Sequence, residues 1–183
     1  ETRGNRGLFN QEGIHVGVQQ MESTLHYGPS VGLNGYSYAN FKLNREEGFN
    51  DDFHTFRLGW TPTTMQFSVD NTIVGSINAT SDGGFWNRGR FDERDPGRDN
   101  PWKRNSIMAP FDQEFFIILN VAVGSRIYFG DDLTNESGEK PWKNDAPYPM
   151  TDFWDGREQW LPTWKLETDS SHMQVDYVRV YAV

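Results

Sequence analysis

The sequence predicts an all-β fold, an antiparallel sandwich or jelly roll, from three observations. Residues 115–123 are apolar at every position except Asn120, and they lie between Pro110 and Gly124. A β-branched and aromatic run of this kind is typical of a strand buried on both faces, and the alternative, a buried helix, is disfavoured by the flanking Pro and Gly. Two alternating segments flank Asp70–Asn71, as the arms of a hairpin would. About eight short segments of this kind follow one another at hairpin spacing, with almost no helix.

The other strands are predicted from the alternation of apolar and polar residues, which turns every second side chain toward a core. The segments before the central run that follow this pattern are residues 14–18, 23–27, 36–43 and 53–60 and the hairpin arms 65–69 and 73–77. A long final strand is expected over residues 173–183. No repeat and no linker divides the chain, so a single domain over residues 1–183 is expected.

Two long stretches are predicted to be loops. Residues 80–108 are rich in Gly, Asp, Arg, Asn and Pro, and a polar loop of this length is more often functional than not. Its arginines alternate with acidic residues, which indicates a salt-bridged loop rather than an anion site. The second loop spans residues 125–149 and is followed at 151–160 by the one segment expected to be helical.

Composition restricts the partners and the compartment. The net charge is -9 with no long run of one sign, so nucleic acid and anionic membranes are poor partners. No apolar stretch reaches about 18 residues, the length that a membrane span requires. The absence of cysteine excludes disulfides and leaves the redox compartment open. Two Asn-X-Ser/Thr triplets, at Asn78 and Asn135, are typical of secreted glycoproteins, so an extracellular protein is expected.

The chain is unusually rich in tryptophan, with 7 among 183 residues. Several lie among polar residues, at Trp86, Trp102, Trp142 and Trp154. An exposed indole offers a flat apolar face on which the C–H groups of a sugar ring can pack. The alternative is that these side chains cover the ends of the sandwich.

Seven motifs that occur in order over the whole chain carry a family resemblance. They are Glu1-Thr-Arg-Gly-Asn5, Ser23-Thr-Leu-His-Tyr-Gly28, Phe53-His-Thr-Phe-Arg-Leu-Gly-Trp-Thr61, Gly83-Gly-Phe-Trp86, Met108-Ala-Pro-Phe-Asp-Gln113, Ile118-Leu-Asn-Val-Ala-Val-Gly124 and Val175-Asp-Tyr-Val-Arg-Val-Tyr181. Together they resemble glycoside hydrolase family 16, in the branch of β-1,3-glucan recognition proteins and invertebrate endo-1,3-β-glucanases that includes annelid coelomic cytolytic factors. The resemblance implies a concanavalin-like jelly-roll β-sandwich whose cleft holds a β-1,3-linked glucan.

The resemblance also implies a catalytic role for the first residue. The family signature is Glu-X-Asp-X-X-Glu, and Glu1 matches its last position, the general acid/base. A retaining glycosidase needs two carboxyls roughly 5–5.5 Å apart. The nucleophile and the intervening Asp of the signature would precede Glu1. The expectation is therefore a C-terminal portion of the domain, with its N-terminal strands and half of the active site outside this sequence.

The remaining site candidates match family positions. His26 is expected on the cleft side, where it would bind sugar hydroxyls, although a histidine satisfied within the core is the alternative. Asn120 is expected to point into the cleft from the central strand, whereas an amide paired with backbone remains open. Trp86 and Trp102 are the expected stacking platforms. Asp176 matches a structural calcium position of some bacterial members, and no other cofactor is expected. The sequence departs from many hydrolases of the family after Gly124, where the usual cleft tryptophan is missing, and replacement by Tyr128 or Phe129 is left open.

The predicted function is that of a secreted β-1,3-glucan-binding protein that recognises microbial cell walls in innate immunity. One alternative is an active retaining endo-1,3-β-glucanase with Glu1 as acid/base. Another is a lectin-like cytolytic factor. The first two share the fold and the ligand, and they differ in whether a nucleophile is supplied.

Overall fold

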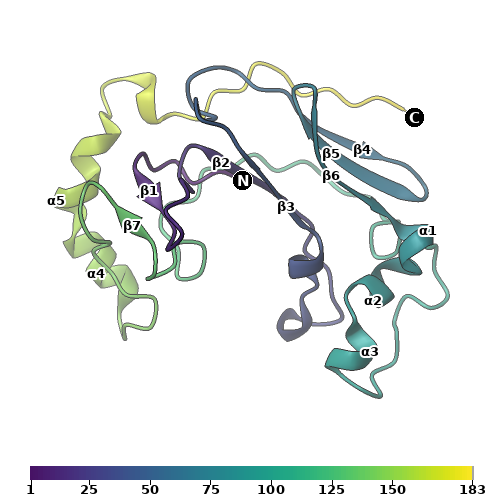
Figure 1. The fold of residues 1–183 in the computed structure, drawn as a ribbon. Helices are drawn as coiled ribbons and strands as arrows, with labels where there is room; N and C mark the ends of the chain where they lie inside the picture. The colour runs from purple at the N-terminus through teal and green to yellow at the C-terminus, as the bar shows by residue number, and fades with distance from the viewer. Residues whose placement is uncertain (183) are drawn as a thin grey trace. The chain divides into compact units, whose positions relative to one another are not determined.

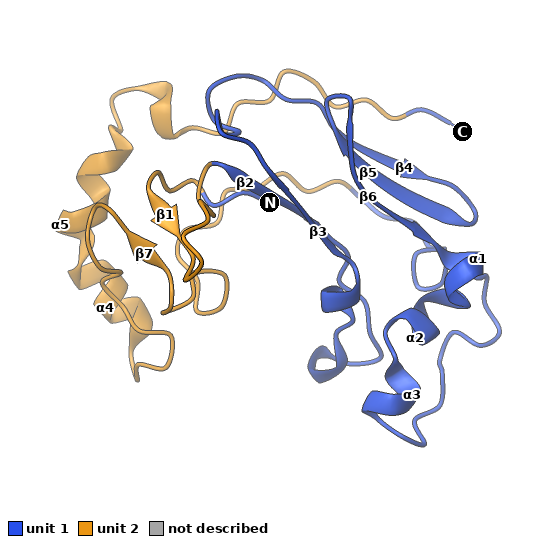
Figure 2. Ribbon diagram, viewed as in Figure 1, with its two compact units in different colours: residues 1–3, 19–116, 181–183 blue, residues 4–18, 117–180 orange. Residues whose placement is uncertain are grey.

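The computed structural model describes residues 1–182 and divides the chain into two compact units (Figures 1 and 2). Unit 1 holds residues 1–3, 19–116 and the C-terminal residues from 181 onward. Unit 2 holds residues 4–18 and 117–180. Each unit has its own secondary structure and is described separately.

Unit 1 contains two antiparallel sheets. A two-stranded sheet pairs β2 (Gln20–Thr24) with β3 (Asn40–Asn44), and a three-stranded sheet has the order β4 (Phe56–Trp60), β5 (Thr64–Val69), β6 (Thr72–Asn78). β3 packs beside β6, where the Phe41 ring lies against Gly75. A Cβ at position 75 would come within 2.2 Å of that ring, so only glycine fits there.

The hairpin predicted around Asp70–Asn71 is confirmed. Val69 pairs with Thr72, which leaves a two-residue turn, and Asp70 has a φ of 53°, in the left-handed region that Asp tolerates. The Asp70 carboxylate accepts hydrogen bonds from the Thr55 backbone N–H and the His54 Nδ1, each at 3.0 Å. Arg45 donates to the same carboxylate at 3.0 Å. The turn therefore anchors the segment that leads into β4.

Short helices fill much of the stretch that was predicted to be a loop at 80–108. They are α1 (Ala79–Asp82), α2 (Gly84–Arg88) and α3 (Phe91–Arg94). Asn78 caps α1 by accepting a hydrogen bond from the Ser81 N–H at 3.1 Å. The loop prediction is wrong here because the aromatic residues of α2 and α3 are buried. Helices this short are not stable by themselves, and the packing of their aromatic side chains stabilises them.

The core of unit 1 is largely aromatic. Tyr27 contacts Phe85, Phe91 and Phe111 edge-on, with ring centroids 5.1–6.1 Å apart. Phe85 and Phe91 are almost completely buried. Burial also raises the pKa of Tyr27 to about 12. The 3-10 turn η2 (Tyr36–Tyr38) occupies the first part of the predicted strand 36–43 and leads into β3, and another 3-10 turn, η1 (Val31–Leu33), precedes it.

Unit 2 has little regular structure. β1 (Leu8–Phe9) pairs antiparallel with β7 (Thr134–Asn135), and the helical elements are α4 (Pro149–Asp155), α5 (Arg157–Trp160), η3 (Leu161–Trp164) and η4 (Asp169–Ser171). The helical segment predicted at 151–160 is thus confirmed as α4 and α5, which meet at Gly156. The strand predicted at 14–18 is reduced to a single bridge between Phe9 and His15.

The central strand predicted at residues 115–123 is not formed. The segment has no strand assignment, and its apolar side chains are more than half exposed. The apolar, β-branched composition favours a strand, but a strand forms only when a neighbouring strand pairs with it. None of the described residues pairs with this segment. The final strand predicted at 173–183 fails in the same way over residues 173–182, and Val183 lies outside the described residues.

The fold class itself is confirmed as all-β and antiparallel. Every sheet of the described residues is antiparallel and the helices are short, which is consistent with the jelly-roll β-sandwich of the resembled family. No helix among residues 1–182 has the length and apolar character to cross a bilayer.

The Asp70 contacts predict a pH-dependent stability. The Thr55 N–H and the His54 ring hold the pKa of Asp70 below its ordinary value of 3.8. The carboxylate therefore contributes stability above that value and loses it as the pH falls through the lower, folded pKa. Asp70→Asn keeps the turn conformation, and we expect it to lower the free energy of unfolding at pH 7 by about 1 kcal/mol, since the carboxylate is partly exposed.

Urea denaturation of both proteins from about pH 7 down to about pH 2 measures this difference, which should shrink in the acid range. Glu47→Gln, at an exposed position in the neighbouring loop, is the control and should follow the wild type. A difference that stayed constant with pH would contradict the role of the Asp70 charge.

Candidate functional site

One face of the β2–β3 sheet is entirely polar. Directly opposed residues of antiparallel strands lie on the same face. The opposed pairs on this face are Gln20 with Asn44, Glu22 with Lys42, and Thr24 with Asn40. The intervening residues, such as Met21 and Phe41, turn toward the apolar side. The alternation within β2 and β3 thus builds a row of hydrogen-bonding groups across two strands.

Glu1 extends this polar face by one more strand. Its backbone nitrogen donates to the Glu22 carbonyl at 2.7 Å, and the Glu22 N–H donates to the Glu1 carbonyl at 2.8 Å. Thr2 bridges Met21 in the same antiparallel register. Glu1 is therefore directly opposite Glu22, and the two side chains belong to the same face of the sheet.

The Glu22 carboxylate is the centre of this face. It is only 8% exposed. Asn40 donates to it at 2.8 Å, and Arg3 and Lys42 form ion pairs with it at 3.4 Å and 3.5 Å. The Asn40 amide also donates to Thr24 Oγ1 at 2.7 Å. A buried carboxylate requires such partners, so Glu22 acts as a structural anchor for the polar groups around it.

A pocket of about 370 Å³ opens beside Glu1 and β2. This volume lies in the range of small-molecule sites. Its lining combines the polar or charged residues Glu1, Glu22, Ser23, Thr24, His26, Arg57 and Ser68 with the apolar residues Met21, Phe56, Leu58 and Phe67. The structure therefore brings two of the predicted site residues, Glu1 and His26, into one pocket within unit 1.

The His26 ring has a defined orientation. Asn34 Oδ1 accepts the Tyr36 N–H at 3.0 Å, which turns the Asn34 Nδ2 toward His26 Nδ1, also at 3.0 Å. Since an amide nitrogen can only donate, His26 Nδ1 accepts and the proton of the neutral ring lies on Nε2. The Tyr36 ring stacks on the imidazole with centroids 5.6 Å apart. His26 is exposed, so the alternative of a core histidine does not apply.

The structure corrects the exposed positions expected for Trp86 and Trp102. Trp86 is only 4% exposed, and its Nε1 donates to Asp92 at 2.9 Å. Trp102 is half-buried and meets the Trp86 ring edge-on at 5.9 Å. Both indoles belong to the aromatic core of unit 1 because their stretch folds into helices rather than an open loop. The two indoles therefore fit the alternative prediction, in which they cover the end of the fold, better than the prediction that they stack on sugar rings.

Asn120 and Asp176 do not join the pocket. Asn120 lies in unit 2, in the extended segment described above, and is exposed. Asp176 is also exposed, in the segment that was predicted to be the last strand. Within residues 1–182, no group of three or more His, Asp or Glu side chains is arranged to hold a metal ion.

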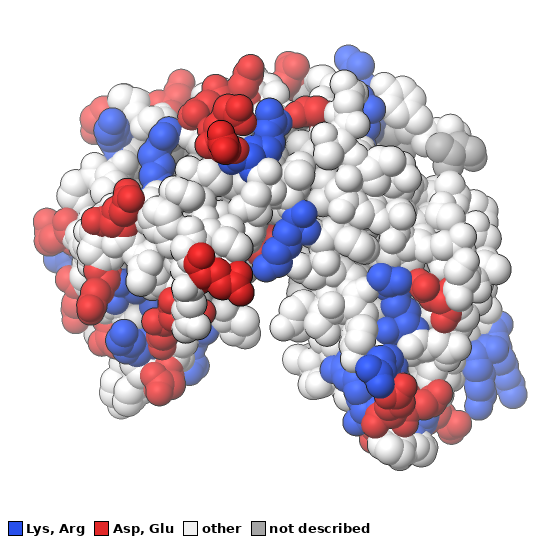
Figure 3. Space-filling model, viewed as in Figure 1, with Lys and Arg blue, Asp and Glu red and all other residues white. Residues whose placement is uncertain are grey.

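Three arginines of residues 80–108 are engaged by acidic neighbours, as the sequence predicted. Arg88 pairs with Asp82, Arg90 with Glu93 and Arg98 with Asp95. Figure 3 shows acidic and basic side chains close together over this part of unit 1. These arginines are thus unsuited to an anion site.

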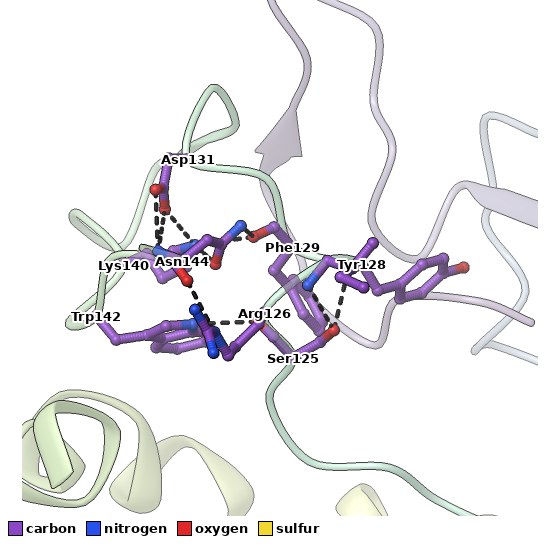
Figure 4. Close-up of polar contacts among 9 residues, drawn as sticks. Ser125, Arg126, Tyr128, Phe129, Asp131, Lys140, Trp142 and Asn144 are labelled. Carbon is purple, nitrogen blue, oxygen red and sulfur yellow. Dashed lines mark hydrogen bonds and ion pairs between the residues drawn. The ribbon is translucent and has the colours of Figure 1, made fainter. Parts of the chain in front are cut away.

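In unit 2, a lysine organises the loop predicted at 125–149 (Figure 4). Lys140 Nζ donates to the Phe129 carbonyl at 2.8 Å and to Asn144 Oδ1 at 2.7 Å, and it pairs with Asp131. The ammonium group holds the pKa of Asp131 below its ordinary value. Trp142 lies under Lys140, with Nζ 4.9 Å from the ring centroid. These contacts tie together residues 129–144, on either side of β7.

Several residues of the polar face were not anticipated from the sequence. Glu22, Asn40 and Lys42 were assigned to strands or their margins without a role. The sequence holds only part of the signal: Gln20, Glu22 and Thr24 are spaced two apart with Met21 and Leu25 between or beside them, but Gln19 and Ser23 are polar too. The register that places Lys42 opposite Glu22 could not be read from alternation alone.

These features define an antiparallel all-β protein with a polar strand face beside a pocket of ligand size. Residues 17–90 match the family described as Glycosyl hydrolases family 16. The resemblance in the sequence motifs is thereby confirmed.

Relatives extend the similarity over nearly the whole chain. A "Beta-1,3-glucan-binding protein" of Penaeus monodon is 39% identical over 187 aligned residues, which cover 99% of this chain and 47% of the relative. "Gram-negative bacteria-binding protein 1" of Drosophila melanogaster is 36% identical, covering 99% and 33%. "Beta-1,3-glucan-binding protein 1" of Galleria mellonella is 35% identical, covering 91% and 32%. The chain thus spans between about half and a third of the length of these relatives. No solved structure gives a significant match.

The burial of Trp86 predicts a loss of stability on substitution. We expect Trp86→Ala to lower the free energy of unfolding by about 3–5 kcal/mol, because a cavity replaces a buried indole. Urea denaturation followed by circular dichroism measures the change. Trp154→Ala removes an exposed indole and should stay within about 0.5 kcal/mol of the wild type. Equal stabilities for the two variants would contradict this placement of Trp86.

Proposed function

We propose that the chain is part of a β-1,3-glucan-recognition protein of innate immunity and that the glucan binds in the pocket beside Glu1. The observation that carries the proposal is the convergence of Glu1 and His26 on one pocket beside β2, β4 and β5. The family match and the names of the relatives support the choice of ligand.

The lining suits a pyranose ring. Glucose presents apolar C–H faces and a rim of hydroxyl groups, each of which donates one hydrogen bond and accepts others. The pocket offers apolar surface from Phe56, Leu58 and Phe67. The Glu1 carboxylate accepts hydrogen bonds from hydroxyls, and the His26 Nε2–H donates to them. Few polar groups within a partly apolar pocket are the usual arrangement for orienting a ligand.

Hydrolysis is the second candidate function, favoured by the place of Glu1 in the pocket. Retaining hydrolysis requires a nucleophilic carboxylate beside the acid/base. The other pocket carboxylate, Glu22, is committed to Arg3, Lys42 and Asn40. We therefore propose that hydrolysis would need a further carboxylate as nucleophile, as the family signature implies, and that glucan binding is the function that the lining of this pocket supports.

We also propose that the protein is extracellular, where microbial glucans are met. Asn78 and Asn135 of the two glycosylation triplets lie at the ends of short elements, with Asn78 exposed and Asn135 partly so. Both positions are compatible with an attached glycan.

Binding is tested with laminarin in solution and curdlan as an insoluble glucan. We expect His26→Ala to weaken laminarin binding about tenfold, the effect of losing one well-placed hydrogen bond of about 1.4 kcal/mol. Isothermal titration calorimetry measures the change. His172→Ala is the matched control, since His172 is an exposed histidine of unit 2 paired with Asp169. Unchanged affinity for His26→Ala would remove His26 from the binding site.

Catalysis is tested on a longer chain that includes the protein's own residues upstream of Glu1. We expect that chain to hydrolyse laminarin with retention at the anomeric centre if the upstream residues carry Glu-X-Asp, and Glu1→Gln to lower the rate at least about a hundredfold. Reducing-sugar release and NMR of the first product measure both. Release that is unaffected by Glu1→Gln would exclude Glu1 as the acid/base.

A further inference from the structure

Trp154 differs from the other tryptophans of the chain. Its side chain is 58% exposed, whereas the six others are buried or partly buried. It lies on α4 in unit 2, outside the pocket described above. Trp154 is thus the tryptophan whose ring is most accessible to a ligand.

The helix that carries Trp154 is fixed from its other side. Phe153 stacks on Trp160 with ring centroids 4.4 Å apart and planes 11° apart, and it meets Trp142 edge-on at 5.3 Å. Trp160 Nε1 donates to the Phe153 carbonyl at 3.0 Å. This aromatic packing holds α4 in place, so Trp154 is presented on a rigid support rather than on a mobile loop.

Two neighbours extend the exposed indole into a small platform. Met150 is four residues before Trp154, which places the two side chains on the same side of the helix, and Met150 is also exposed. The Arg157 guanidinium lies 5.2 Å from the Trp154 ring centroid, and its Nη1 donates to the Trp154 carbonyl at 3.1 Å. The arginine therefore lies over the indole ring, held by the Trp154 carbonyl, and brings guanidinium N–H groups next to the ring.

The charge around the platform restricts what it can bind. Residues 149–160 contain the acids Asp152, Asp155 and Glu158 and a single basic residue, Arg157. This excess of negative charge disfavours nucleic acid and anionic lipid surfaces. A neutral polyol is not repelled by these charges. Its hydroxyl groups can donate hydrogen bonds to the acidic side chains and accept them from the Arg157 guanidinium.

We propose that Trp154, with Met150 and Arg157, forms a second carbohydrate contact that stacks on a glucose ring of a β-1,3-glucan. The proposal rests on the proposed function and adds a site in unit 2 to the pocket in unit 1. Its consequence is avidity: a long glucan with many identical rings can engage more than one contact, whereas a short oligosaccharide occupies one at a time.

The test uses the whole chain with Trp154→Ala, Trp154→Tyr and His26→Ala. We expect Trp154→Ala to lower the apparent affinity for curdlan about tenfold, as loss of an anchoring aromatic does, and to leave binding of a short laminarioligosaccharide to the pocket unchanged. Trp154→Tyr, which keeps a flat ring, should retain most of the curdlan affinity. His26→Ala should weaken the binding of both ligands.

Tyr177→Ala is the matched control, because Tyr177 is also an exposed ring of unit 2 with an arginine, Arg179, 4.2 Å from its centroid. It should bind curdlan as the wild type does. If Trp154→Ala binds curdlan normally while His26→Ala does not, the second contact is wrong and the proposed function stands. If the wild type itself binds neither ligand, both proposals are wrong. If Tyr177→Ala loses as much affinity as Trp154→Ala, a specific role for Trp154 is excluded.

Discussion

The burial of the Glu22 carboxylate is the constraint on which the candidate site depends. A carboxylate with so little exposure needs partners within the protein. Glu22 has three: ion pairs with Arg3 and Lys42 and a hydrogen bond from Asn40. Arg3 belongs to the N-terminal segment, whereas Lys42 and Asn40 both lie on β3, so the Glu22 side chain on β2 ties the N-terminal residues to both strands of the β2–β3 sheet. The position of Glu1 follows from the same register, because Glu1 and Glu22 exchange two backbone hydrogen bonds.

The parts of the fold that the sequence predicted well are those set by local rules. The hairpin at Asp70–Asn71 needs only two alternating arms and a residue that tolerates positive φ. The helical segment after residue 148 begins with Pro149, which favours a first helical turn, and α4 ends at Gly156. The antiparallel all-β class follows from many short alternating segments taken together. His26 and Glu1 were found through motif resemblance, and the structure brings them into one pocket.

The errors arise where the outcome depends on distant partners. Trp86 has polar neighbours in the sequence, yet it is buried because Phe91 and Trp102 pack around it. Residues 115–123 have the composition of a central strand, yet composition carries no information on whether a neighbour is present to pair with them. The anchoring role of Glu22 depends on the pairing of β2 with β3, and cross-strand register is not encoded in either strand alone. Long-range contacts, rather than local preferences, account for each of these differences.

The extended segment at 116–123 has a consequence for the behaviour of the chain in solution. It presents Phe116, Ile117, Ile118 and Leu119 to solvent in succession, with no charged residue and no proline among its eight positions. Backbone amides and carbonyls in such a run form a template for intermolecular β-pairing, and sequences of this composition are those that stack into cross-β fibrils. Self-association through this segment would be concentration-dependent and promoted by neutral salts, which screen the repulsion between copies of an acidic chain.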